Sequence, residues 1–330
     1  MPEPIGNPLE LFYCYASEDE ELRSELDKHL SNLRNLNLIK TWHFGDIGPG
    51  TEWEPEIDRH LRAADLILLL VSSAFFASSY CYGREMEQAL QRHREGTARV
   101  VPIILRPVHY KGAPFSRLRA LPTRAKPVTI WGNRDEAYTN IVEGLRRVIE
   151  ELQASRRTAA DGWLQKGVAL NKQKRYEEAI HTLDKVIQLN PNDADAYYNK
   201  GFALRKLQRY EEAIHAFDKA IQLNPNDADT YHNQGIVLRD LQRYEEALVA
   251  FDKAIQLNPN DAKVYINKGC ALNDLKRHEK ALVAFDKAIQ LNPNDLFAHY
   301  TKGVALWHFL HRYEEASDVF DQAQRCRGSR

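Results

Sequence analysis

Residues from about Asp161 to Arg330 repeat with a period of 34 residues. The run Arg-Tyr-Glu-Glu-Ala begins at Arg175 and recurs, once in altered form, at Arg209, Arg243, Arg277 and Arg312. A fixed period of this length with helical spacing predicts stacked helix–turn–helix units, because one unit cannot bury its apolar face alone. Such arrays rarely carry catalytic residues, so we expect any catalytic site within the first 155 residues or so.

The overall composition indicates a soluble two-domain protein. The 330 residues carry a net charge of −1, and no basic stripe points to nucleic acid. No cysteine pair has C-x-x-C spacing, which argues against a zinc site or disulfides and favours the cytoplasm. Residues 1–4 lack a secretory signal, and the longest apolar run, residues 66–77, is too short for a membrane span.

The period divides the second half into five units, 160–193, 194–227, 228–261, 262–295 and 296–330. Glycines occupy the eighth position of every unit, where two helices must approach closely: Gly167, Gly201, Gly235, Gly269 and Gly303. Alanines mark a second close crossing: Ala179, Ala213, Ala247, Ala281 and Ala316. Prolines end the second helix of the first four units, since proline cannot continue a helix: Pro191, Pro225, Pro259 and Pro293.

This pattern resembles the tetratricopeptide repeat (TPR), whose all-α solenoid binds peptides or proteins on its concave face. The matching inner positions are mainly apolar or aromatic: Leu164, Val168, Tyr198, Phe202, His232, Ile236, Ile266 and Cys270. The lysines, asparagines and arginines that clamp a terminal carboxylate in the best-known version are absent from these positions. We expect an unidentified protein or peptide there, or self-association, whereas a plain spacer is the simpler alternative.

The last unit differs from the others. It has a one-residue insertion near His308 and no additional polar capping helix. We therefore expect Val319, Phe320 and Ala323 to remain partly uncovered and to contribute to oligomer formation.

The first 152 residues alternate strand-like and helix-like segments. Five strands are expected, at 9–15, 38–44, 66–71, 100–105 and 128–131, with helices at 80–95 and 136–152 among those between and after them. This alternation predicts a parallel sheet covered by helices, with ligands at the carboxyl ends of the strands. Residues 153–159 are expected to link this domain, 1–152, to the repeats, 160–330.

Three segments of this domain resemble the Toll/interleukin-1 receptor (TIR) domain, most of all its bacterial members. Residues 12–19 resemble the opening box, residues 46–53 the BB loop, and residues 80–86 the helix that bears the catalytic glutamate of members that cleave NAD⁺. The resemblance covers about residues 8–152 and implies a flavodoxin-like, five-stranded α/β fold.

The same resemblance makes Glu85 the expected catalytic residue, with NAD⁺ as substrate and no cofactor or metal. A nicotinamide that is already cationic leaves without a proton, so one carboxylate can stabilise the oxocarbenium-like ribose electrostatically. The implied substrate-binding residues are Tyr15, Ala16, Ser17, Asp46, Tyr80, Cys81 and Tyr82. The implied loop for assembly comprises Asp46, Ile47, Gly48, Pro49, Gly50 and Trp53.

Sequence spacing alone does not separate catalysis from an ordinary surface role for Glu85. A glutamate in such a charged helix is usually solvated, whereas Glu87 lies on another face. The chain departs from NAD-cleaving relatives at Ala16 and Ser17, where some have basic residues, and at Cys81, where tryptophan is frequent. These departures leave open which residues contact the substrate. A ring that stacks on the nicotinamide, as tryptophan does in those relatives, would have to come from Tyr80 or Tyr82.

The sequence thus predicts a cytoplasmic NAD⁺ glycohydrolase that releases nicotinamide and ADP-ribose or a cyclic isomer. The repeats would control it by oligomerisation or partner binding, and the resemblance suggests bacterial immune defence. The alternative is a non-catalytic TIR adaptor that acts through homotypic contacts, or a repeat scaffold with an inert TIR domain.

Overall fold

The computed structural model describes residues 6–328, and the chain divides into two compact units, of which the first ends at Thr158 and the second begins at Ala159. The first unit contains a four-stranded parallel sheet in the order β2–β1–β3–β4. Its strands are β1 (Leu9–Cys14), β2 (Ile39–Trp42), β3 (Leu66–Val71) and β4 (Arg99–Ile104). The expected parallel α/β architecture is confirmed.

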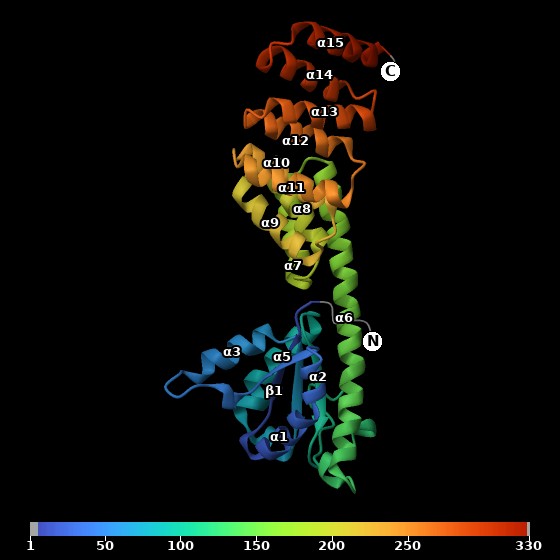
Figure 1. Cartoon of the computed structure of the whole chain (residues 1–330). Helices are drawn as coiled ribbons and strands as arrows, with labels where there is room; N and C mark the ends of the chain where they lie inside the picture. Colours follow the sequence, from blue (N-terminus) through green and yellow to red (C-terminus); the bar gives the residue numbers. More distant parts are fainter. Residues whose placement is uncertain (1–5, 329–330) are drawn as a thin grey trace. The chain divides into compact units, whose positions relative to one another are not determined.

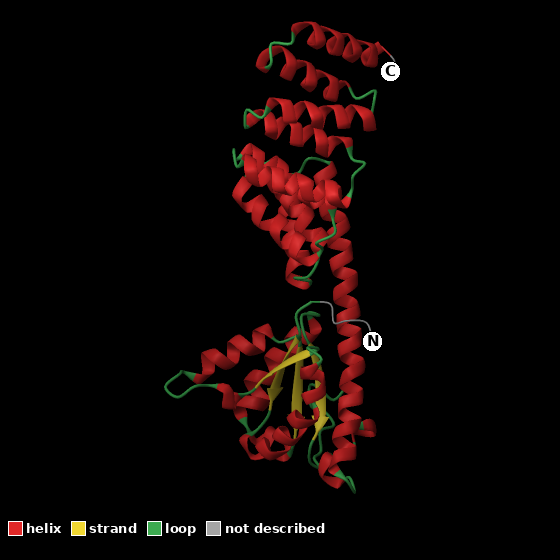
Figure 2. Cartoon of the chain, viewed as in Figure 1, coloured by secondary structure: helices red, strands yellow, loops and turns green. Residues whose placement is uncertain are grey.

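Helices cover both faces of this sheet (Figures 1 and 2). Alternate residues of each strand enter two different apolar clusters, as the two-residue period of a strand requires. One cluster contains α1 (Glu20–His29), α2 (Ser31–Asn35) and the first part of α6 (Arg134–Lys172). The opposite cluster contains α3 (Trp53–Ala63), α4 (Ser73–Ala77) and α5 (Met86–Arg94).

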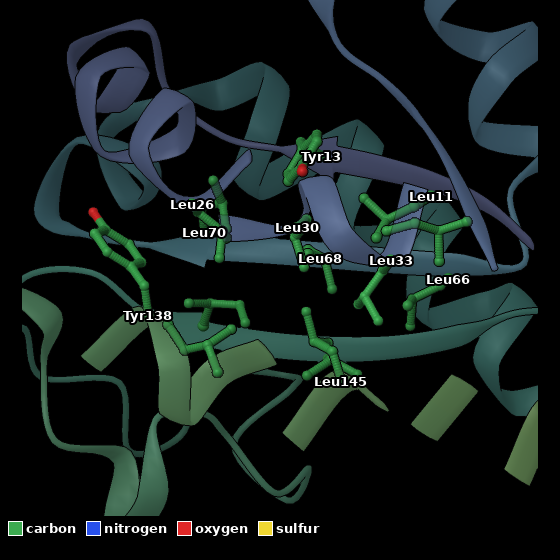
Figure 3. Packing of buried hydrophobic residues seen from close by; sticks show 14 of the residues in the cluster. Leu11, Tyr13, Leu26, Leu30, Leu33, Leu66, Leu68, Leu70, Tyr138 and Leu145 are labelled. Atoms are coloured by element: carbon green, nitrogen blue, oxygen red, sulfur yellow. The ribbon is translucent and has the colours of Figure 1, made fainter. Parts of the chain in front are cut away.

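Burial on both faces explains why β3 is a continuous Leu/Ile/Val segment. All six of its residues are buried. Figure 3 shows Leu66, Leu68 and Leu70 of β3 beside Tyr138 and Leu145 of α6.

The fifth strand expected at 128–131 is absent, and Val128–Ile130 form a short 3₁₀ turn instead. Leu121 makes a single bridge to β4: its N–H donates to the Pro102 carbonyl, and its own carbonyl accepts from the Ile104 N–H. Pro122 follows this bridge, and proline has no N–H with which to extend a ladder. Val128 still contributes a buried side chain to the core.

The linker expected at 153–159 is also absent as a separate segment. These residues lie within α6, which continues without a break into the first repeat. They contain neither glycine nor proline, so nothing in their sequence ends the helix.

The second unit consists of five successive helix pairs, beginning with the last part of α6. The later helices are α7 (Tyr176–Leu189), α8 (Ala194–Lys206), α9 (Tyr210–Leu223), α10 (Ala228–Asp240), α11 (Tyr244–Leu257), α12 (Ala262–Asp274), α13 (His278–Leu291), α14 (Leu296–Val304) and α15 (Tyr313–Gly328). Figure 1 shows α12–α15 stacked as successive antiparallel pairs. This all-α array confirms the expected solenoid.

The repeated glycines and alanines lie at the predicted close approaches. A Cβ atom added to Gly269 would lie 2.4 Å from Phe285, and the glycines of the other units have equivalent neighbours. All five repeated alanines are fully buried. A residue with positive φ lies two positions beyond the end of the first helix of each pair: Lys174, Gln208, Gln242, Lys276 and His311.

The insertion near His308 is accommodated by a π-helical turn at Ala305–Phe309. A π turn takes up one extra residue, so the following helix α15 keeps its packing. Val319 and Ala323 are buried, which contradicts the expectation for these two residues, whereas Phe320 is half-buried and lies against Gly303. The exposed apolar side chains of the last unit are others, among them Phe297, Tyr300, Trp307, Phe309 and Tyr313.

Candidate active site

A cavity of about 650 Å³ lies at the carboxyl end of β1. Six of the eight expected catalytic and substrate-binding residues line it: Tyr15, Ala16, Ser17, Tyr80, Cys81 and Glu85. Trp53 of the expected assembly loop lines it as well. Other lining residues come from the end of β2, from α3 and from α4. The carboxyl end of a parallel strand is where ligands of such folds bind, so the topology brings these segments together.

The segment that carries Glu85 is a π-helix, Ser79–Glu85, rather than the regular helix expected from Tyr80 onward. The Ser78 hydroxyl caps it by accepting a hydrogen bond from the Cys81 N–H at 3.2 Å. The wide turn places both Cys81 and Glu85 in buried positions next to β1. Such turns are frequent at functional sites because they redirect side chains.

Glu85 is 6% exposed. The Cys14 thiol donates a hydrogen bond to its Oε2 atom at 2.9 Å. Burial, with a smaller contribution from the neighbouring Cys81, raises the pKa of Glu85 to about 8. The hydrogen bond from Cys14 opposes this shift only in part, and no lysine, arginine or histidine is among the lining residues. A pKa of about 8 favours the protonated form of Glu85 at neutral pH.

The two cysteines beside Glu85 hold the π-helix against the end of β1. Cys81 donates its thiol proton to the Tyr15 carbonyl at 3.2 Å. Burial raises the pKa of the Cys14 thiol well above its usual value, so Cys14 remains a neutral donor to Glu85. Among the described residues, no group of histidine, cysteine and acidic side chains could hold a metal ion.

Aromatic side chains form one wall of the cavity. The rings of Trp53 and Tyr80 meet edge to face, with their centroids 5.0 Å apart. The Phe44 ring also meets the Trp53 ring edge to face, with a centroid distance of 6.3 Å. Phe44 and Trp53 are 53% and 40% exposed. Stacking partners for a planar ligand are therefore present, although Cys81 itself is not aromatic.

Two expected binding residues do not line the cavity. Asp46 accepts a hydrogen bond from the His43 backbone N–H at 3.0 Å, in the short turn after β2. Tyr82 packs against Phe75 and Phe76 in the core. Glu87 is exposed, which agrees with its placement on another face than Glu85.

The loop between β2 and α3 projects from the sheet (Figure 2). The Thr51 N–H donates to the Gly48 carbonyl at 3.2 Å, and Gly50 has φ +84°. A turn with Pro49 at its second position and Gly50 at its third needs this positive φ. Trp53 begins α3 immediately afterwards, as expected.

The sequence interpretation missed an ionic group beneath the cavity. Asp19 is fully buried, accepts a hydrogen bond from the Ser72 hydroxyl, and pairs with Arg106 at 2.7 Å. It thereby connects the segments that follow β1, β3 and β4. The only available signal was an acidic residue soon after the first strand.

A second missed group supports Tyr15 from beside the cavity. The Tyr15 hydroxyl donates to Glu20, and Arg23 binds the two oxygens of the same carboxylate at 3.2 and 2.6 Å. Glu20 lines the cavity, but its charge is matched by Arg23. Glu85 is thus the buried carboxyl group of this cavity that has no cationic partner.

The inner positions of the repeats largely mediate contacts between neighbouring units. Tyr198 accepts a hydrogen bond from Asn233 at 3.3 Å, and a ring nitrogen of His232 lies 2.8 Å from the Asn267 amide. The cationic groups of Arg205 and Lys206 lie over the Phe202 ring, each 5.4 Å from its centre. Ile266 is buried, and the other seven expected groove residues are half-buried. The face is therefore less apolar than the expected residues alone indicated.

Comparison with known proteins identifies both parts of the chain. Residues 11–142 match the TIR domain, and residues 167–295 match tetratricopeptide repeats. The chain is therefore a fusion of a TIR domain and a TPR array.

Several known proteins are similar to parts of this chain. The uncharacterized protein y4lF of Sinorhizobium fredii strain NGR234 is 45% identical over 136 residues, which are 41% of this chain and 42% of that protein. MamA (41-end) from Desulfovibrio magneticus RS-1 is 26% identical, with a TM-score of 0.49 over 52% of this chain and 97% of its own. YrrB, described as a TPR protein with an unusual peptide-binding site, is 26% identical, with a TM-score of 0.45 over 56% of this chain and 92% of its own.

Proposed function

We propose that this protein is an NAD⁺ glycohydrolase in which Glu85 is the catalytic residue. The observation that carries the proposal is a buried carboxyl group without a cationic partner, in an aromatic-walled cavity at the carboxyl end of β1. Perturbed carboxyl groups in cavities are frequent at catalytic sites. The TIR fold is compatible with this activity.

The reaction needs little proton transfer. The bond between ribose C1′ and the nicotinamide nitrogen breaks, and its electron pair neutralises the pyridinium ring. The ribose becomes oxocarbenium-like, and the Glu85 carboxylate stabilises that positive charge. Water, or a nitrogen of the adenine, then attacks C1′ and loses a proton, which gives ADP-ribose or a cyclic isomer.

Substrate binding would change the protonation of Glu85. Its pKa of about 8 belongs to a cavity without cations. A cationic nicotinamide nearby favours the carboxylate, so NAD⁺ binding near neutral pH would release a proton. The buried Glu85 carboxylate accelerates the reaction because it stabilises the positive charge that develops on the ribose beside it.

The repeats would regulate this site by bringing TIR domains together or by binding a protein partner. No basic residue of the cavity can hold the pyrophosphate of NAD⁺, so a neighbouring subunit or a moved loop would supply it. Residues 6–328 include no helix that is both long and apolar enough to cross a membrane. We place the protein in the cytoplasm and, by its resemblance to bacterial TIR proteins, in immune defence.

The test compares Glu85→Gln with Glu87→Gln in the full-length protein. Glu87 is exposed and lies two residues away, so the same substitution there controls for charge and helix propensity. Wild type and Glu87→Gln should release nicotinamide, at least when tethered into oligomers, and Glu85→Gln should not. Intact NAD⁺ with every wild-type form would exclude the activity.

The lack of a basic group in the cavity also supports a second candidate, a non-catalytic TIR adaptor. In that case the projecting loop and the repeats would mediate self-association and protein binding. Self-association without NAD⁺ cleavage, unchanged by Glu85→Gln, would favour this function.

A further inference from the structure

A second cavity of the TIR unit, of about 380 Å³, lies at the free edge of β4 beside α6. Its floor forms where Leu121 joins that edge by the single bridge to Pro102 and Ile104. Gly144 of α6 permits this approach, because a Cβ atom there would lie 2.6 Å from the Leu121 side chain. This cavity shares no lining residue with the Glu85 cavity.

Arginines dominate the lining of this second cavity. Its basic residues are Arg99, Arg117, Arg119 and Arg147, against the acidic residues Glu143 and Glu151, which leaves two positive charges in excess. Arg99 pairs with Glu151 at 3.2 Å. Arg117, Arg119 and Arg147 make no ion pair or hydrogen bond with any residue in 6–328.

Other polar groups of the cavity do not compensate this charge. His93 lines it as well, and its Nδ1 atom accepts a hydrogen bond from the Val100 N–H at 3.2 Å. Burial, with Arg99 nearby, lowers the pKa of His93, so it stays neutral. Asn140 accepts from the N–H and hydroxyl of Thr123 at 2.8 and 2.9 Å, which leaves its amide nitrogen as a further donor.

Three unpaired guanidinium groups around one cavity repel one another, and an anion relieves that repulsion. The planar fork of arginine matches the geometry of phosphate oxygens and binds them through paired hydrogen bonds. A volume of about 380 Å³ lies at the small end of the range for small-molecule sites. We propose that this cavity binds a small phosphate-bearing molecule through Arg117, Arg119 and Arg147, separately from Glu85.

The test is calorimetric titration of the full-length protein with inorganic pyrophosphate at low ionic strength. We expect saturable binding that weakens at least about tenfold in the Arg117→Gln/Arg119→Gln double variant. Both arginines are exposed, and their replacement removes no hydrogen bond or ion pair within residues 6–328. Arg94→Gln is the matched control, since Arg94 is an exposed arginine outside the cavity.

Three further measurements complete the test. Glu85→Gln should bind pyrophosphate as wild type does, because this site does not depend on the proposed enzymatic function. Equal affinity in the double variant and Arg94→Gln, or no saturable binding by wild type, would overturn the proposal. The proposal would also fail if wild type bound no pyrophosphate and the double variant sedimented differently from wild type. That result would show that the arginines contact another protein molecule instead of a phosphate.

Discussion

Replacing Glu85 with glutamine should stabilise the TIR unit at neutral pH but have much less effect in acid. The pKa of this carboxyl rises from an ordinary 4.5 to about 8 on folding. The unfolded chain then binds fewer protons than the folded one between these pH values, so stability falls as pH rises. The contribution of Glu85 to the free energy of unfolding is fully present below pH 4.5 and is lost progressively up to about pH 8.

The size of the effect follows from the same shift. One pH unit within this window is worth about 1.4 kcal/mol, so moving from about pH 5 to about pH 7.5 costs wild type about 3 kcal/mol through Glu85. Glutamine does not titrate, so the Glu85→Gln variant loses no stability through this residue over the same pH interval. The stability difference between Glu85→Gln and wild type should therefore grow by about 3 kcal/mol across this interval.

The assay is urea unfolding of the full-length protein, followed by tryptophan fluorescence. Replacing Trp163 and Trp307 of the repeats with phenylalanine, in every protein compared, leaves tryptophans only in the TIR unit. Glu87→Gln should show no such growth with pH, because its carboxyl is exposed. An equal effect of Glu85→Gln at both pH values would refute the argument from burial.

Three other predictions concern activity and packing. If Glu85 acts as a carboxylate, kcat/KM for NAD⁺ should rise about tenfold per pH unit below pH 8 and level off above pH 8. A kcat/KM that is constant from pH 6 to 8 would contradict that role. Gly269→Ala should destabilise the repeats by about 1–3 kcal/mol in thermal unfolding, since its Cβ would meet Phe285, and an unchanged Tm would contradict this. Asp19→Asn should destabilise the TIR unit by about 1–3 kcal/mol in urea unfolding, because the hydrogen bonds from Ser72 and Arg106 lose their charged acceptor; a change below about 0.5 kcal/mol would contradict this.

The sequence predicts the repeats best because their constraints recur in every unit. Each unit has a glycine at the close crossing, and the structure places an aromatic ring or Leu183 against each one. The π turn at Ala305–Phe309 could not be predicted, because the sequence shows where the extra residue lies but not how the backbone accommodates it.

The TIR unit was harder to predict where tertiary contacts override local pattern. The segment 128–131 is as apolar as a strand, yet Leu121 takes the place beside β4. Residues 153–159 resemble a linker only because they stand between two recognisable domains. Their sequence favours helix, and α6 passes through them.

The sequence interpretation named several residues that line one cavity, and their roles in a reaction stay predictions. Tyr15, Tyr80 and Glu85 line one cavity, whereas Asp46 and Tyr82 do not. The sequence predicts a regular helix over residues 80–95, whereas Glu85 lies in a π-helix and is buried. The partners of Asp19 come from two other strand ends, and no local pattern can pair them.

The most direct test of the central claim is NMR observation of free nicotinamide during incubation of NAD⁺ with full-length protein. The protein should be tethered into oligomers, and wild type, Glu85→Gln and Glu87→Gln should be compared at matched concentration. We predict nicotinamide release by wild type and Glu87→Gln and none by Glu85→Gln. Equal release by all three, or intact NAD⁺ with wild type, would contradict the assignment of Glu85 as the catalytic residue.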